Sequence, residues 1–403
     1  MIIKYYREKA GLTQEQLGKG ICSITHLSKI ERGLTQYSPN ITDLIYKRLG
    51  IDVQIEVKHF KNLRKRLEQW HEAIIMEEIE DVEIIKEELE KNPFIHLPDF
   101  EMMFKLMETR YYLFKLNMKK ALQIIKKVQK KDSCPSKYEE NLLKHILGIY
   151  YIRSSNLLKA ITILKTIDEG TYNNQEYFYH LAIAYSGTNS KVLAYHYAEK
   201  SLQFFKRTNN FRMVIDAECL MLGQLGSDEL RDFDEASQQY KTLIKRCDMC
   251  NAQHKKAKIF HNLAVKYFER KEFVNANRYF LESMTLKNKQ TSSYLSSFSG
   301  HIRSCLEERS LVPKDDLYLL IKDGLNLAEK LQDECYKIIF TLLLYLIENR
   351  QEEYYRYLHY EGVPLFKQNG DVFSTQYFQK DLFDYYLKIG NQGAALEIAR
   401  SLI

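Results

Sequence analysis

The strongest constraint on the fold of this chain is a spacing of small and aromatic residues that recurs along most of its length. In the best copy, small and aromatic side chains alternate at Ala264, Tyr267, Ala276, Phe280 and Ser283. Small side chains let two helices approach closely, and the aromatic side chains fill the space between neighbouring helix pairs. We therefore expect a repeated hairpin of two antiparallel helices.

The repeat extends to the C-terminal end of the chain. Its second-helix alanines recur at intervals of about forty residues, or about three times that, at Ala121, Ala160, Ala194, Ala236, Ala276 and Ala395. The pattern resembles the tetratricopeptide repeat, whose regular period is about thirty-four residues, so helices or loops should be extended. Two weaker hairpins are expected between residues 288 and 368. Because one hairpin cannot bury its own faces, stacking supplies the core. We predict an all-α fold, with a tetratricopeptide-like right-handed α-superhelix over residues 71–403.

Residues 1–52 carry the signals of a helix-turn-helix. Thr13 can cap a helix, and Gln16, three residues later, completes a capping box. Gly18 and Gly20 mark a turn, after which Ser23 can cap a second helix. A third helix is expected from Ile41, with Leu44, Ile45 and Leu49 on its apolar side.

The second of these helices is predicted to read DNA. Leu27 and Ile30, three residues apart, should face the core. The opposite side then faces solvent near the helix N-terminus, which a recognition helix presents to base edges in the major groove. We expect Thr25 and Lys29 at base edges and Ile24 at a thymine methyl group. With Gln14 and Ser23 at phosphates, the predicted DNA contacts are Gln14, Ser23, Ile24, Thr25, His26 and Lys29.

The charge of the chain is concentrated at the same end. Residues 1–70 contain 13 Lys and Arg against 7 Asp and Glu, which accounts for the whole net charge of +6. Neutralising DNA phosphates requires such an excess. Residues 53–70 are basic with apolar residues at helical spacing, and we interpret them as a linker helix that docks on the array or pairs with a second subunit. A basic helix that reaches DNA phosphates is the alternative.

Two resemblances follow from these segments. Residues 1–52 resemble the Xre/Cro-type repressor domain through the run of Thr13, Gln14, Leu17, Ser23, Leu27, Ser28, Lys29, Ile30, Glu31 and Gly33. A domain of this type fused to a long tetratricopeptide array resembles the RRNPP quorum-sensing regulators of Gram-positive bacteria, in particular the NprR- and PlcR-like members. The resemblance implies a cytoplasmic transcription regulator whose array binds a short, re-imported signalling peptide. The related Rap proteins imply an alternative, a protein–protein regulator of a phosphorelay response regulator.

Candidate peptide contacts lie in the first helices of the hairpins. The backbone of an extended peptide must be hydrogen-bonded, and the Asn amide both donates and accepts. We expect Asn262 to bond the peptide backbone and Lys258 to meet a carboxylate. His180 is the equivalent of Asn262 in an earlier repeat, and Tyr179 and Tyr294 should form walls of side-chain pockets. A solvated position on a helix face is the alternative for Asn262, Lys258 and His180.

A homodimer is expected because two-fold operators need two copies of a helix-turn-helix. We predict contacts between C-terminal hairpins around Phe373, Tyr377 and Leu382.

Enzyme, cofactor and membrane functions are not expected. The chain has no P-loop, GxGxxG, HExxH or GxSxG in the required context. No apolar run reaches the roughly 18 residues of a membrane span, and no signal peptide opens the chain. Cys247 and Cys250, with His254 and His261 downstream, allow a zinc site, but thiols at the end of a continuous helix are the favoured interpretation. We expect no metal and no cofactor.

Overall fold

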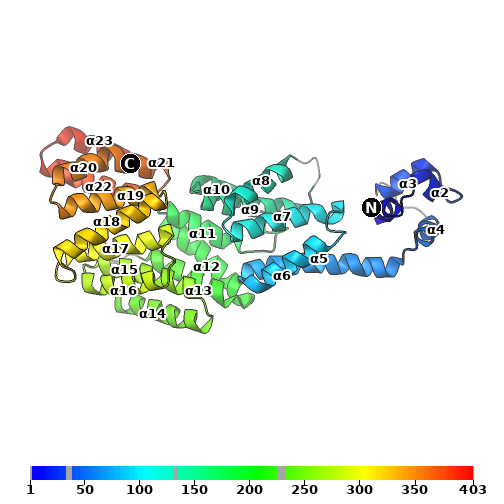
Figure 1. Ribbon diagram of the computed structural model, residues 1–403, viewed down its shortest axis with the longest axis horizontal. Coiled ribbons are helices and arrows are strands. Elements are labelled where there is room, and N and C mark those ends of the chain that lie inside the picture. Colours follow the sequence, from blue (N-terminus) through cyan, green and yellow to red (C-terminus); the bar gives the residue numbers. More distant parts are fainter. Residues whose placement is uncertain (1, 33–38, 131–134, 226–232, 403) are drawn as a thin grey trace. The chain divides into compact units, whose positions relative to one another are not determined.

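The computed structural model describes residues 2–32, 39–130, 135–225 and 233–402, and these form helices and turns without a β-strand (Figure 1). The all-α prediction is confirmed. The chain divides into two compact units, Met1–Ile146 and Leu147–Ile403, with the boundary inside helix α9 (Lys137–Arg153). Within the described ranges, no helix combines the length and apolar character that a bilayer crossing requires.

The N-terminal part of the first unit is a small bundle of four helices: α1 (Ile2–Lys9), α2 (Gln14–Gly18), α3 (Ile24–Glu31) and α4 (Pro39–Leu49). Leu17, Leu27 and Ile45 are fully buried in its core. The expectation for Leu44 is wrong, because its side chain is 49 % exposed. Neighbouring helix positions lie about 100° apart, and α4 directs Ile45 rather than Leu44 to the core. Gly33 of the predicted run lies outside the described residues.

The predicted linker helix, residues 53–70, is part of the longer helix α5 (Val53–Met76), which packs on α6 (Ile79–Lys91) and α7 (Pro98–Phe114) of the first unit. Helix α8 (Met118–Gln129) follows and packs on α7. Trp70 is fully buried, stacks on Phe104 of α7, and donates its indole N–H to the carbonyl of Val82 at 3.0 Å. The linker helix is therefore docked on helices of the array, which is one of the arrangements expected for it.

The second unit consists of successive helix hairpins (Figure 1). After α9 come α10 (Leu157–Leu164), α11 (Tyr177–Gly187), α12 (Lys191–Arg207), α13 (Phe211–Gln224), α14 (Phe233–Met249), α15 (Gln253–Glu269) and α16 (Phe273–Thr285). They are followed by α17 (Ser292–Glu307), α18 (Lys314–Lys330), α19 (Glu334–Ile347), α20 (Gln351–Tyr357), the π-helical turn η1 (Leu358–Gly362), α21 (Val363–Gln368), α22 (Val372–Lys388) and α23 (Gln392–Leu402). Helices α17 to α21 occupy the region predicted to hold two weaker hairpins.

Close helix approach at the small positions explains the repeat signature. A Cβ atom added to Gly148 would lie 2.4 Å from Leu164, and one added to Gly300 would lie 2.4 Å from the ring of Phe280. Ala264 and Ala276 are fully buried. Larger side chains at these positions would push the paired helices apart, so the spacing of small and aromatic residues determines how the hairpins pack.

Candidate DNA-binding helix and candidate peptide groove

Both helix caps of the predicted helix-turn-helix are present. The Thr13 hydroxyl accepts from the Gln16 N–H at 3.1 Å, and the Gln16 side chain accepts from the Thr13 N–H at 2.8 Å, which completes the capping box of α2. At the start of α3, the Ser23 hydroxyl accepts from the His26 N–H at 3.3 Å. These bonds satisfy N–H groups that have no partner within the helix.

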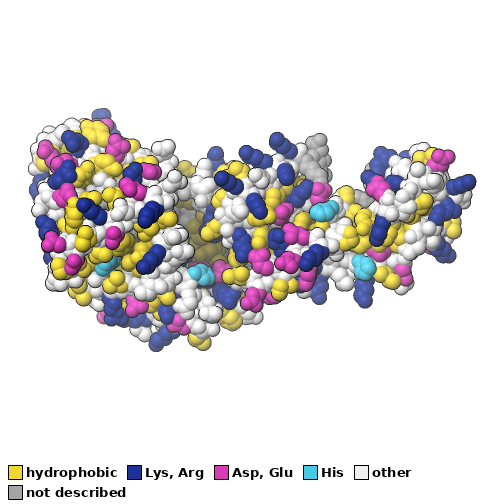
Figure 2. Space-filling view, in the orientation of Figure 1, with side chains coloured by type: hydrophobic (Ala, Val, Ile, Leu, Met, Phe, Trp, Pro, Cys, Tyr) yellow, Lys and Arg dark blue, Asp and Glu magenta, His cyan; other side chains and the backbone are white. Residues whose placement is uncertain are grey.

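The predicted recognition face of α3 is exposed. Ile24 is 50 % exposed, and Thr25, His26 and Lys29 are also exposed, while Leu27 on the opposite side is fully buried. Figure 2 shows Lys and Arg side chains over the part of the surface that α1 to α4 form. This face has the exposure and charge that a major-groove contact needs.

A buried ion pair, which the sequence analysis did not identify, holds α3 against α1. Glu31 is 3 % exposed, and Arg7 donates to its two carboxylate oxygens at 2.6 and 3.1 Å. Burial raises the pKa of Glu31, but the bonds from Arg7 and Gln14 outweigh it and the net pKa is lowered. A sequence signal was available: Glu31 stands one helical turn after Leu27, on the core side of the helix.

Gln14, which was expected at a phosphate, has a partner inside the domain. Its amide donates to Glu31 at 2.8 Å, and its side chain is partly buried. The amide therefore helps to neutralise the buried carboxylate. Contact between Gln14 and DNA remains a prediction.

In the second unit, polar side chains of three first helices meet in a group that we call the acid–lysine cluster. Its members are Tyr179 of α11, Asp216 and Cys219 of α13, and Lys255, Lys258 and Asn262 of α15. Asp216 is 8 % exposed and pairs with both lysines, with Lys258 at 3.5 Å. The Asn262 amide donates to the Cys219 sulfur at 3.3 Å.

The acid–lysine cluster carries a net positive charge. Burial raises the pKa of Asp216, but the charges of Lys258 and Lys255 outweigh burial. The net pKa is lowered, so the carboxylate is ionised. Two ammonium groups thus share one carboxylate. Lys255 is only 2 % exposed, whereas the Lys258 side chain is 48 % exposed. Lys258 is therefore the cation of this cluster that a ligand can reach.

Of the predicted peptide contacts, Asn262, Lys258 and Tyr179 come together, whereas Tyr294 does not join them. Tyr179 is 7 % exposed and packs edge-on against Phe205. Burial raises the pKa of Tyr179 to about 12, and the negative charge of Asp216 contributes to this shift. Tyr294 is 9 % exposed and belongs to a separate core. Because both rings are mostly buried by the protein itself, they offer a ligand little surface.

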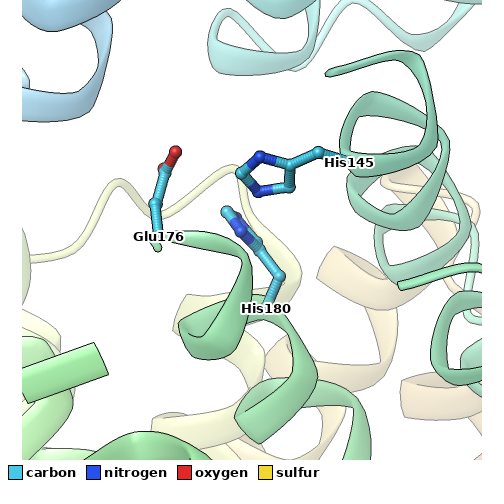
Figure 3. A group of neighbouring side chains, drawn as sticks. All are labelled: His145, Glu176 and His180. Atoms are coloured by element: carbon cyan, nitrogen blue, oxygen red, sulfur yellow. The ribbon is translucent and has the colours of Figure 1, made fainter. Parts of the chain in front are cut away.

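His180 lies one turn into α11 and is partly buried. Figure 3 shows it together with Glu176, which precedes the same helix. Both side chains have interactions within the protein.

A second polar group on the first helices, the lysine–histidine cluster, was not predicted. It consists of His261 of α15, Ser283 of α16, Ser296 and Ser297 of α17, and Lys287 between α16 and α17. The His261 Nδ1 atom lies 2.9 Å from the Ser297 hydroxyl, and Lys287 donates to the same hydroxyl at 2.7 Å. The sequence offered only a weak signal, namely His261 next to Asn262.

Cys247 and Cys250 have the environment of ordinary thiols. Cys247 is fully buried near the end of α14, and burial raises its pKa to about 12. Such a thiol is protonated at neutral pH, whereas zinc binds thiolate. The interpretation of the pair as thiols at the end of a helix agrees with this position.

The residues expected at a dimer contact have different environments. Leu382 is fully buried in a core with Phe366 and Phe378, so it cannot contact a second subunit, and this expectation is wrong. Tyr377 is 46 % exposed, and its hydroxyl accepts from Arg303. The side chain of Phe373 lies outside the described part of the structure.

Comparison with known proteins supports this organisation. Residues 3–45 match the helix-turn-helix family model. The chain is 21 % identical over 392 residues to the transcriptional activator NprA of Geobacillus stearothermophilus, covering 92 % of this chain and 94 % of that protein. It is 21 % identical over 301 residues to the response regulator aspartate phosphatase I of Bacillus subtilis (strain 168), covering 69 % and 74 %. The crystal structure of NprR in complex with its cognate peptide NprX superposes with a TM-score of 0.67 at 19 % identity, covering 85 % of this chain and 98 % of that one.

These findings confirm the predicted resemblance in two respects. The N-terminal segment is a helix-turn-helix domain. The repeat array has the fold of the NprR structure, a tetratricopeptide-like superhelix. Together they confirm the resemblance to RRNPP regulators, and a transcriptional activator and the crystal structure of a Rap protein are both among the similar chains.

Proposed function

We propose that this chain is a cytoplasmic transcription regulator that binds an operator through α3 and is controlled by a short peptide in the groove of its second unit. The observation that carries the proposal is the exposed face of α3, in one chain with polar side chains that meet on successive first helices of the second unit. Similarity to NprA and to a peptide-bound NprR supports both halves. The peptide would act by changing the curvature of the array through hinge motions between neighbouring hairpins.

A homodimer is part of this proposal. A helix-turn-helix dimer reads two half-sites about one helical turn of DNA apart. Apolar side chains exposed on the C-terminal helices are available for contact with a second subunit; they are Tyr360, Tyr377, Leu387, Ile389 and Leu396.

The peptide half of the proposal depends on Asn262. Among the described residues, its amide makes one weak bond, to the Cys219 sulfur, so oxygen and N–H capacity remains for a peptide backbone. Lys258 next to it provides a positive charge on the same helix. An extended peptide of roughly five to ten residues would lie across α11, α13, α15 and α17.

Lys29→Ala should weaken binding to the specific operator by about 1–3 kcal/mol and relax base preference at one position, because a base contact is lost. The operator is first selected from random duplex DNA with the full chain, and a dimer should select inverted half-sites. Lys65→Ala, which removes an equally exposed charge from α5, is the control and should leave base preference unchanged. Unchanged operator preference in Lys29→Ala would remove α3 from the recognition role.

Asn262→Ala should weaken peptide binding by about 1–3 kcal/mol, because peptide backbone groups lose their partner. Calorimetry with peptides encoded in small reading frames beside the gene measures this. Asn275→Ala, which removes an amide from the second helix of the same hairpin, is the matched control and should bind as the parent does. Equal affinity in Asn262→Ala would place the site elsewhere on the array.

The second candidate function is regulation of a phosphorelay response regulator. It is favoured by the similarity to response regulator aspartate phosphatase I, which covers 69 % of this chain. Absence of binding by every nearby peptide, together with capture of a purified response regulator, would favour it over the first.

A further inference from the structure

Lys287 is a partly buried cation without an acidic partner. Its ammonium group donates to the Ser297 hydroxyl at 2.7 Å and to the Ser293 carbonyl at 2.8 Å. No carboxylate among the described residues forms an ion pair with it. Burial lowers the pKa of Lys287 to about 8, so the protonated form has lost solvation without gaining a counter-charge.

The acid–lysine cluster contains a buried lysine that does have an acidic partner. Lys255 is buried against Asp216, which restores the lost solvation with an ion pair. Lys258 also shares that carboxylate. The carboxylate expected from the sequence at Lys258 would therefore meet a cation that is already neutralised in part. An added anion should therefore stabilise the charge of Lys287 more than that of Lys258.

Among the described residues, the polar neighbours of Lys287 are neutral hydrogen-bonding groups, which suits the binding of an anion. His261 is within reach of the Ser297 hydroxyl at 2.9 Å and of the Ser296 hydroxyl at 3.4 Å. Burial and the charge of Lys287 lower the pKa of His261 to about 3, so the ring is neutral and can donate one N–H. The Tyr336 hydroxyl of α19 also bonds Ser296. The ammonium group of Lys287 is thus connected through the Ser297 hydroxyl to His261, and through His261 to Ser296.

The position of this group fits a peptide held by Asn262. His261 and Asn262 are consecutive on α15, and consecutive helix side chains diverge by about 100°. Asn262 bonds Cys219 of α13, whereas His261 bonds serines of α17. The two clusters therefore lie on either side of one helix, along the direction in which an extended peptide would cross it.

We propose that the lysine–histidine cluster binds a carboxylate of the groove peptide, with Lys287 as its ion-pair partner and His261 and Ser296 as hydrogen-bonding neighbours. The inference rests on the proposed peptide-binding function and adds the chemistry that the peptide must carry. The carboxylate is either the C-terminus of the peptide or an acidic side chain. These two sources make the same ion pair and differ only in the peptide.

A mixture of synthetic random heptapeptides tests the proposal. The mixture is made with free C-terminal carboxylates and again with C-terminal amides, and peptides retained by the full chain are identified by mass spectrometry. The parent chain should favour free acids over amides, or peptides with Asp or Glu over those without, by about ten- to hundredfold. The first preference identifies the chain end as the source, and the second identifies a side chain.

Three variants assign the preference to Lys287. Lys287→Met should lose it, Lys287→Arg should keep it because the charge is retained, and Lys289→Met, an exposed neighbour, should behave as the parent does. A parent chain that retains peptides without any carboxylate preference overturns the inference and leaves the proposed function intact. So does a preference that survives in Lys287→Met. Retention of no peptide at all overturns the proposed function itself.

A measurement on the unmodified chain guards against a Lys287→Met variant that folds poorly. Acetic anhydride labelling across pH, read by peptide mapping, reports the ionisation of Lys287. A retained free-acid peptide should raise the pKa of Lys287 from about 8 and slow its labelling, because a nearby anion favours the ammonium form. Labelling that is the same with and without the peptide would contradict the ion pair.

Discussion

Replacing Glu31 with glutamine is expected to destabilise the helix-turn-helix by about 3–5 kcal/mol, because one partner of a buried ion pair is removed. The carboxylate is 3 % exposed and neutralises Arg7, whose side chain is only 11 % exposed. In the variant, the guanidinium loses its buried counter-charge and keeps only the ion pair with the exposed Glu8. Operator binding should fall with the folded fraction, although Glu31 is not among the predicted DNA contacts.

Amide hydrogen exchange of α2 and α3 in the full chain measures this loss directly. Glu8→Gln is the matched control, since Glu8 also pairs with Arg7 but its side chain is 56 % exposed. An exposed ion pair contributes about 1 kcal/mol or less, so the control should exchange nearly as the parent does. Equal protection in Glu31→Gln and the parent would show that the pair does not stabilise the domain.

The same ion pair predicts a direction for the effect of pH. The pKa of Glu31 is lower in the folded domain than in the unfolded chain. Its contribution is therefore fully present above the unfolded pKa of about 4.3, and it is lost as the pH falls through the lower folded value. The acid-induced loss of protection in α3 should be smaller in Glu31→Gln, which has no carboxylate to protonate.

Asp216→Asn is expected to destabilise the second unit by about 3–5 kcal/mol for the same physical reason. Lys255 is 2 % exposed and pairs with Asp216, so the variant removes a negative charge that lies against this buried ammonium group. The substitution keeps the size of the side chain, which separates the loss of charge from the loss of packing. Urea unfolding followed by circular dichroism provides the free energy.

A control for Asp216→Asn is available on the same helix. Glu218→Gln breaks the ion pair with Arg246, whose side chains are 24 % and 46 % exposed, and the expected cost is about 1 kcal/mol or less. A cost of Asp216→Asn no greater than that of Glu218→Gln would mean that water reaches Lys255.

Much of the fold could be predicted because its signals are local. The capping box of Thr13 and Gln16 and the cap at Ser23 each lie within four residues of sequence, and all are present. The hairpin signature is local in the same sense, since Gly148 and Leu164 belong to adjacent helices of one hairpin. Side chains on one face of a helix follow from its period, so the exposure of Ile24, Thr25 and Lys29 was also predictable.

By itself, then, the amino-acid sequence determined the helices, their caps, the hairpin repeat and the exposed face of α3, because each depends on residues close together in the chain. Tertiary structure alone decided which charges are neutralised. Arg7 and Glu31 are 24 residues apart, and Asp216 and Lys255 are 39 apart, distances that no helical period encodes. It also decided that Tyr294 and Leu382 are buried and that Lys287 lies beside hydroxyl and carbonyl groups, with no carboxylate partner among the described residues, since burial depends on which hairpins stack against each other.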